Sequence, residues 1–147
     1  MVKITLPDGS QREYEKGINS LEIARSISEG LARNVLAAKV NGNVQDLDTP
    51  INIDADFQLL TWRDKEGKST MWHSSAHLMA EALEALYPGI KLAIGPPIDR
   101  GFYYDIDFCD YSISEKDLPE IEQKMKELAK LKSKFVKKEV SKADALK

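Results

Sequence analysis

The sequence predicts an α+β protein with two domains: a ubiquitin-like β-grasp domain in residues 1–62 and a second α+β domain in residues 63–147. The β-grasp prediction rests on the order strand, strand, helix, strand, strand within about 60 residues. The second domain is indicated by helical apolar spacing in residues 70–86, followed by short strands rich in glycine and proline. Between the two, residues 63–69 (RDKEGKS) are charged and lack an apolar stripe, so we expect a linker or an exposed turn there.

A hairpin begins the first domain. Val2, Ile4 and Leu6 alternate with polar residues, as in a strand with one buried face. Residues 7–9 (PDG) form a turn, because proline fixes φ and glycine accepts a positive φ. A second strand is expected within residues 10–17, and so short a link makes the two strands a hairpin.

One helix and two more strands complete this domain. The helix is expected over residues 19–34, with Asn19 or Ser20 as its N-cap. The apolar residues at helical spacing, which should form its buried stripe, are Leu21, Ala24, Ile27 and Leu31. Residues 35–51 then supply a strand, an Asn-Gly-Asn turn and a short return, and residues 56–62 supply the last strand.

The next helix carries the only two histidines of the chain. It should run from about residue 70 to 86, capped by Ser69 or Thr70 and ended before Pro88. Its buried stripe should consist of Met79, Leu83 and Leu86. A second stripe consists of His73, His77, Glu81 and Glu84. The two histidines should therefore project together, away from the core.

Two short strands and a helix come after it. Residues 91–108 (KLAIGPPIDRGFYYDIDF) predict two strands joined by a turn through PPIDRG. The helix after them should be capped by Asp117 with Glu120 as a capping box, and it should have Pro119 in its first turn. Its apolar face should consist of Leu118, Ile121, Met125 and Leu128.

The last residues predict an interrupted domain. Residues 135–140 (FVKKEV) alternate like a strand, and residues 141–144 (SKAD) predict a new helix cap shortly before the sequence ends. A helix usually needs about 12 residues to be stable, because its nucleation is costly. We therefore expect the second domain to be incomplete.

Composition narrows the class of protein. A hydrophobic content of 42% and a charged content of 31% are typical of a soluble globular chain, and no apolar run approaches the roughly 20 residues of a membrane span. The first residues lack a secretory signal, so we expect a cytoplasmic protein. The single cysteine, Cys109, cannot form an internal disulfide or a multi-cysteine zinc site.

Charge is unevenly distributed along the chain. The net charge of −3 divides into −6 for residues 1–110, which hold 11 basic and 17 acidic side chains, and +3 for residues 111–147, which hold 10 and 7. Proteins that bind nucleic acid by counterion release usually have a clustered basic surface. The acidic body argues against strong autonomous binding to a phosphate backbone.

The spacing of His73 and His77 leaves three functions open. They could be an exposed polar stripe, two ligands of a metal ion with Glu81 as the only further ligand on that face, or catalytic groups in a hydrolysis. An imidazole can accept a proton from water near neutral pH. If His73 lies in the first turn of its helix, the positive end of the helix dipole should favour the neutral ring.

Three segments, in this order, resemble the N-terminal region of the threonyl-tRNA synthetase family: VKITLPDGSQREYEKG, HSSAHLMAEALEALYPG and AIGPPIDRGFYYDID. The resemblance covers essentially the entire chain. Residues 1–62 resemble the TGS domain, which several kinds of protein carry, and the combination with HSSAH and GFYYD is more specific. The resemblance implies that residues 63–147 begin an editing domain, which hydrolyses serine wrongly attached to threonine tRNA.

The resemblance also implies roles for single residues. His73 and His77 match the HxxxH motif of the family, which implies that they are catalytic residues of the editing site. Tyr104 in GFYYD is implied to line the pocket for the end of the tRNA. The family completes this site with a CxxxH motif, whereas this sequence has no third histidine and Cys109 is not followed by one. Residues 1–147 alone should therefore hold half of an editing site, without activity, cofactor or metal.

The full-length enzyme, by resemblance, is a cytoplasmic homodimer that uses ATP, Mg²⁺ and Zn²⁺ to attach threonine to its tRNA. A second hypothesis assigns no enzymatic activity: a regulatory or RNA-contact module in which the TGS domain binds a partner. Gene length distinguishes the two hypotheses, because only a ligase requires a CxxxH motif and a class II aminoacylation domain downstream of residue 147.

Overall fold

A computed structural model describes residues 1–134 and 136–147. The chain forms two compact units, one of Met1–His77 with Leu92–Ile106 and the other of Leu78–Lys91 with Asp107–Lys147. Helix α3 (Lys65–Leu86) contributes its first part to one unit and its last part to the other. Among the residues described, no helix is both long enough and apolar enough to cross a membrane.

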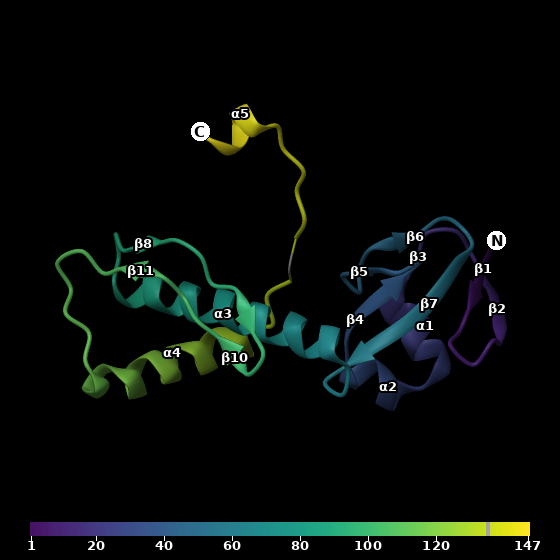
Figure 1. Ribbon diagram of the computed structural model, residues 1–147, viewed down its shortest axis with the longest axis horizontal. Helices are drawn as coiled ribbons and strands as arrows, with labels where there is room; N and C mark the ends of the chain where they lie inside the picture. Colours follow the sequence, from purple (N-terminus) through teal and green to yellow (C-terminus); the bar gives the residue numbers. More distant parts are fainter. Residues whose placement is uncertain (135) are drawn as a thin grey trace. The chain divides into compact units, whose positions relative to one another are not determined.

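A five-stranded sheet with the order β2-β1-β7-β4-β5 forms the first unit (Figure 1). Its strands are β1 (Val2–Thr5), β2 (Gln11–Tyr14), β4 (Val35–Val40), β5 (Asn43–Gln45) and β7 (Ala55–Thr61). β1 and β7 are parallel, and the other neighbours are antiparallel. This is the β-grasp arrangement predicted for the first domain. Two further short strands, β3 (Ile18–Asn19) and β6 (Pro50–Ile51), pair with each other and were not predicted.

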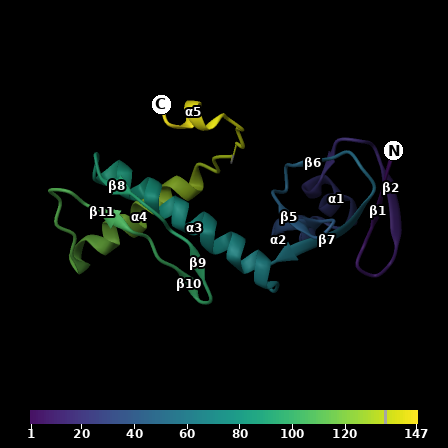
Figure 2. The ribbon, with the colours of Figure 1, turned by 45° about the horizontal axis from the view of Figure 1, so that its top comes forward.

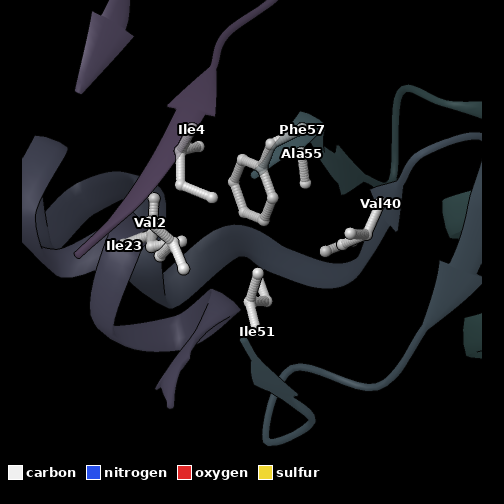
Figure 3. Close-up of a cluster of buried hydrophobic side chains, with 8 residues drawn as sticks. Val2, Ile4, Ile23, Val40, Ile51, Ala55 and Phe57 are labelled. Atoms are coloured by element: carbon white, nitrogen blue, oxygen red, sulfur yellow. The ribbon is translucent and has the colours of Figure 1, made fainter. Parts of the chain in front are cut away.

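The core lies between this sheet and helix α1 (Ser20–Ile27), as Figure 3 shows. Val2 and Ile4 are buried and Leu6 packs partly buried against them, as the alternation along β1 predicts. The buried residues of the cluster are Val2, Ile4, Ile23, Ala38, Val40, Ile51, Ala55 and Phe57. Burying a side chain the size of isoleucine stabilises the fold by about 1.5–3 kcal/mol, so this cluster is the main source of stability of the unit.

The single helix predicted for residues 19–34 is wrong, because two helices occupy this segment. α1 ends at Ile27, the backbone of Ser28 is extended (φ −169°, ψ 135°), and α2 (Glu29–Asn34) comes next. The Ser28 hydroxyl accepts a hydrogen bond from the backbone N–H of Leu31 at 3.2 Å and so caps the second helix. Asn19 caps α1 as predicted, since its side chain accepts from the N–H of Glu22 at 2.9 Å.

The buried face of α1 also differs from the predicted stripe. Ile23 is completely buried together with Ala24, whereas Leu21, Ile27 and Leu31 are only half-buried. The break at Ser28 shortens the helix that contacts the sheet. The part of the predicted stripe that lies in α2, Leu31, therefore does not cover the core.

A tight turn connects β7 to α3. The backbone N–H of Thr61 donates to the Asp64 carboxylate at 2.7 Å, and the N–H of Asp64 donates to the Thr61 carbonyl at 3.0 Å. The linker or exposed turn predicted for residues 63–69 is confirmed only at residues 63 and 64, because α3 begins at Lys65. The predicted caps Ser69 and Thr70 lie inside the helix. The end of α3 at Leu86, before Pro88, agrees with the prediction.

Residues 91–107 form four short strands in two ladders, where the sequence predicted two strands (Figure 2). β9 (Pro97–Ile98) and β10 (Gly101–Phe102) are antiparallel and joined by Asp99 and Arg100, so the turn is shorter than the predicted PPIDRG segment. β8 (Lys91–Leu92) pairs with β11 (Ile106–Asp107) at the other end of the hairpin. Between the two ladders, Asp105 exchanges backbone hydrogen bonds of 2.9–3.0 Å with Ala93 and Ile94.

Helix α4 (Leu118–Lys130) belongs to the second unit and lies directly after a 3-10 turn, η1 (Glu115–Asp117). The predicted capping box of Asp117 with Glu120 is wrong. The Asp117 carboxylate instead accepts from the N–H and the hydroxyl of Ser114, at 2.8 and 3.0 Å, so it stabilises the turn before the helix. Pro119 lies in the first turn of α4, as predicted.

The predicted apolar face of α4 is confirmed in part. Ile121 is buried, Met125 and Leu128 are half-buried, and Leu118 is exposed. In the same unit, Tyr87 contacts Phe108 and Tyr111 edge to face, with ring centroids 6.2 and 5.3 Å apart. The unit is therefore stabilised by scattered contacts rather than by one large cluster.

The segment after α4 agrees with the predictions at its end only. Of the strand predicted for residues 135–140, residue 135 lies outside the described residues, and residues 136–140 are not in a strand. Helix α5 (Lys142–Ala145) begins where predicted, because the Ser141 hydroxyl accepts from the N–H of Asp144 at 3.2 Å.

Candidate functional site

His73 and His77 lie one turn apart on the outer face of α3, and their rings are stacked. The ring centroids are 4.7 Å apart and the planes differ by 29°. Both residues are exposed, while Ala76 between them is completely buried. Because the two residues are four positions apart on one helix, their rings project in the same direction, as the sequence predicts.

His73 lies too far from the start of α3 for the predicted effect of the helix dipole. α3 begins at Lys65, so His73 is its ninth residue and lies beyond the first turn. The influence of a helix dipole falls off within that turn. The prediction that the dipole favours a neutral His73 is therefore wrong, and any activation of this imidazole has to come from side chains or substrate near it.

A metal ion would need further ligands beside the pair. Among residues 1–134 and 136–147, no group of three His, Cys, Asp or Glu side chains is arranged to hold a metal ion. Glu81 and Glu84 are exposed on later turns of α3. Two imidazoles alone fall short of the four ligands of a tetrahedral zinc site, so the geometry gives this alternative no third ligand.

Tyr104 lies between β10 and β11 and is half-buried. Its ring lies directly against Gly95 on the other arm of the hairpin, where a Cβ atom would collide with the ring. This contact explains why glycine is needed at position 95. The role of Tyr104 in lining a ligand pocket stays a prediction.

A groove at the start of α3 was not predicted. It has a volume of about 510 Å³ and lies between the first two turns of α3 and the tip of the β9–β10 hairpin. We call it the basic groove; its lining residues are Arg63, Lys65, Lys68, Ser69, Trp72, Pro97, Ile98 and Asp99. Its signal in the sequence is the i, i+3, i+4, i+7 spacing of the four residues from α3, which the charged and glycine-containing character of that segment obscures.

The two tryptophans of the chain meet at this groove. The rings of Trp62 and Trp72 are 5.6 Å apart and perpendicular, and the Lys68 ammonium lies 6.0 Å from the centre of the Trp62 ring. Edge-to-face packing and a cation over a ring are both favourable, which fixes the aromatic wall of the groove.

Comparison with known proteins shows that the chain is similar to one domain family and to several ligases. Residues 2–61 match the TGS domain family. The chain is 66% identical over 146 residues to the threonine–tRNA ligase of Cytophaga hutchinsonii, 58% over 147 residues to that of Bacteroides thetaiotaomicron, and 53% over 146 residues to that of Flavobacterium johnsoniae. These matches include at least 99% of the chain, which spans only 22–23% of the length of these relatives.

These findings confirm the resemblance of the chain to the threonyl-tRNA synthetase family. The relatives are enzymes, and the β-grasp order of the first unit agrees with the domain that was matched. Residues 2–61 are therefore similar to the TGS domain, and the whole chain is similar to the N-terminal quarter of threonine–tRNA ligases.

Proposed function

We propose that the chain is the N-terminal region of a threonine–tRNA ligase and that residues 63–147 begin its editing domain. The observation that carries the proposal is the 66% identity to such a ligase, which extends over 99% of the chain and thus beyond the TGS domain. The complete enzyme would attach threonine to its tRNA with ATP and hydrolyse mischarged seryl-tRNA. A cytoplasmic location and a homodimer belong to the same proposal.

Editing compensates for the limited selectivity with which a binding site distinguishes threonine from serine. A site built to accept threonine rejects serine only through one missing methyl group, which is worth about 1–3 kcal/mol, or roughly 10–200-fold. A second site that hydrolyses the wrong ester supplies the remaining discrimination.

The stacked histidines suit part of this chemistry. Hydrolysis of an aminoacyl ester needs a positioned water, a group that accepts its proton, and donors to the oxygen that becomes negative. With ring centroids 4.7 Å apart, one imidazole can accept the proton of a bound water while the other donates its N–H to the same water or to the ester. Their exposure leaves both rings open to a substrate.

The remaining groups of the site would come from elsewhere in the enzyme. The sequence has no third histidine and no CxxxH motif, so residues 1–147 alone should show neither editing nor ligase activity. No group of three metal-binding side chains occurs in the described part of the chain, so its residues do not fit the Zn²⁺ of the ligase, which needs at least three protein ligands. We assign this Zn²⁺ to the aminoacylation domain.

The test is a deacylation assay of the full-length ligase on seryl-tRNA specific for threonine. Replacing both His73 and His77 by alanine should slow hydrolysis at least about a hundredfold, because general acid–base catalysis contributes about that much or more. Threonine attachment should be unchanged. Glu84→Ala, an exposed change on the same helix, is the matched control and should leave hydrolysis intact. Unaltered hydrolysis in the double variant would contradict the assignment.

A non-enzymatic TGS module is the alternative. Only the match over residues 2–61 favours it, because that domain occurs in other kinds of protein. The identity to ligases continues through α3, the hairpin and α4, which a TGS module alone does not require.

A further inference from the structure

The edge of the five-stranded sheet at β2 has backbone groups without partners. β2 is the end strand of the order β2-β1-β7-β4-β5 and pairs only with β1 (Figure 1). In an antiparallel pair, about half of the N–H and C=O groups of each strand point away from its neighbour. Apart from the pairing with β1, no backbone group of residues 11–14 has a hydrogen-bond partner within residues 1–134 and 136–147. This edge therefore offers donors and acceptors to an added strand.

The side chains of β2 alternate between the two faces of the sheet. Arg12 and Tyr14 lie opposite core residues of β1, on the face that α1 covers. Glu13 lies opposite Lys3, so it belongs to the open face. Glu13 is exposed and forms no ion pair with any residue that the structure describes. A strand added along β2 would therefore meet a carboxylate that has no ion-pair partner.

A groove at the end of β2 contains further carboxylates. It has a volume of about 600 Å³, and its lining includes Glu13, Glu15 and Glu22. Lys16 and the amino terminus at Met1 are the positively charged groups of the lining. The carboxylates exceed the cations by one, so the groove favours a basic ligand over an anionic one.

A second copy of the chain does not suit this edge. Two β2 strands related by a two-fold axis would pair antiparallel, with residues of the same face opposite each other. The registers that pair most of β2 then place Glu13 opposite Glu13 or Arg12 opposite Arg12. Like charges directly opposite each other are destabilising. The charges of β2 therefore disfavour self-association and favour a strand of complementary charge.

We propose that the edge of β2 docks an extended segment of a partner protein as a sixth strand of the sheet, with Lys or Arg opposite Glu13 and a second basic residue beside Glu15. The residue between these two basic residues is apolar, because it lies opposite the half-buried Tyr14. In such strand addition, main-chain hydrogen bonds supply the affinity and alternate side chains supply the specificity. The partner segment therefore alternates basic and apolar residues.

Peptide titration followed by NMR tests the proposal. The probe is the lysine–valine peptide Ac-Lys-Val-Lys-Val-Lys-NH₂, added to the 147-residue chain. The amide signals of Gln11–Tyr14 should shift and saturate, and these amides should exchange hydrogen more slowly. For so short a peptide we expect a Kd of about 0.1–1 mM. The amides of β5, at the other edge of the sheet, are the internal control and should be unchanged.

Two further peptides separate strand pairing from attraction between charges. Ac-Lys-Pro-Lys-Pro-Lys-NH₂ has the same charge as the probe, but its prolines have no backbone N–H to donate. It should bind at least tenfold more weakly than the lysine–valine peptide. The glutamate–valine peptide Ac-Glu-Val-Glu-Val-Glu-NH₂ can form the main-chain hydrogen bonds but has the wrong charge, and it should not bind.

A charge reversal provides the matched variants. Glu13→Lys with Glu15→Lys should weaken binding of the lysine–valine peptide at least tenfold and should allow the glutamate–valine peptide to bind, because opposite charges across the strands are favourable and like charges are not. Glu81→Lys with Glu84→Lys makes the same change of charge at exposed positions of α3 and should bind like the unaltered chain. Far-UV circular dichroism shows whether each variant is folded.

Three results would each overturn the proposal. The first is that the amides of β2 do not respond to the lysine–valine peptide. The second is equal binding of the lysine–proline or the glutamate–valine peptide, which would mean that no strand of defined charge is added. The third is protection of the β2 amides that increases with protein concentration when no peptide is present, which would identify a second copy as the occupant. None of these titrations involves seryl-tRNA, so the edge of β2 is tested independently of the editing function.

Discussion

At the scale of single residues, the ion pair between Lys39 and Glu66 is the clearest charge interaction of the first unit. Lys39 belongs to β4 and Glu66 to the first turn of α3, and both are partly accessible to solvent. The hydrogen bond from the lysine lowers the pKa of the Glu66 carboxyl below its usual 4.5, with a further contribution from the helix backbone. The charged carboxylate is therefore favoured more in the folded than in the unfolded chain.

This shift predicts a pH dependence with a definite sign. Because the pKa of Glu66 is lower in the folded state, the stabilisation is complete above about pH 4.5 and is lost as the pH falls through the folded pKa. Glu66→Gln should therefore destabilise the chain at pH 7, and the difference should shrink at pH 3. Urea unfolding of both proteins at the two pH values measures it. Glu84→Gln on the same helix is the control, and a Glu66→Gln difference that is independent of pH would contradict the prediction.

Residue roles were predictable from the sequence where they depend on local spacing. The i, i+4 spacing of His73 and His77 predicted the joint projection of the rings, and the alternation of Val2 and Ile4 predicted their burial. Ile23 was missed, because a stripe through residues 21–31 fits an unbroken helix. The Ser28 cap breaks that helix, and a serine can either continue a helix or cap a new one.

At the scale of elements, the contact of Gly67 with the end of β7 fixes where α3 begins. Gly67 is buried, and a Cβ atom there would collide with the backbone carbonyl oxygen of Thr61. The turn bonds between Thr61 and Asp64 hold the two elements together at the same point. This is tertiary information that a charged, glycine-containing segment does not display, which is why the sequence suggested a linker.

Gly67→Ala should destabilise the chain by about 1–3 kcal/mol, because the added methyl group forces the backbone apart. Helix propensity alone predicts the opposite sign, since alanine is favoured over glycine by about 1 kcal/mol inside a helix. Gly30→Ala in α2 is the matched control. Its Cβ would meet only the Ser28 hydroxyl at 3.4 Å, so we expect no loss of stability. Urea unfolding of both variants separates the steric effect from the effect of helix propensity. A Gly67→Ala protein that is more stable than the unaltered chain would contradict the steric explanation.

The basic groove is a second feature that depends on tertiary packing and so could not be predicted from the sequence. The four positions of α3 that line it have regular helical spacing, but Pro97, Ile98 and Asp99 come from a hairpin about 30 residues later in the chain. No local pattern predicts which face of a helix a distant turn approaches. The spacing on α3 was hidden in a segment predicted as a linker or turn, and the part that depends on tertiary packing has no local signal at all.

At the scale of the whole molecule, the two units have unequal cores. The first has a continuous cluster of eight buried residues that includes Phe57 and Ile4. The buried apolar residues of the second unit are Ala80, Ala82, Leu83, Ile90 and Ile121. Two of these five are alanines, which bury little apolar area, so the second unit gains less stabilisation from burial.

This difference predicts that the units open with different free energies. Backbone amides of β1, β4 and β7 should exchange hydrogen only through global unfolding of the first unit, because they lie in the ladders beside its core. Amides of α4 should exchange at least a hundredfold faster, through an opening that leaves the sheet intact. Hydrogen exchange followed by NMR on the 147-residue chain measures both sets together, and fast-exchanging α5 serves as the unprotected reference because its four residues are all exposed. Equal protection of α4 and β7 would mean that the chain unfolds as one cooperative body despite the uneven distribution of its buried side chains.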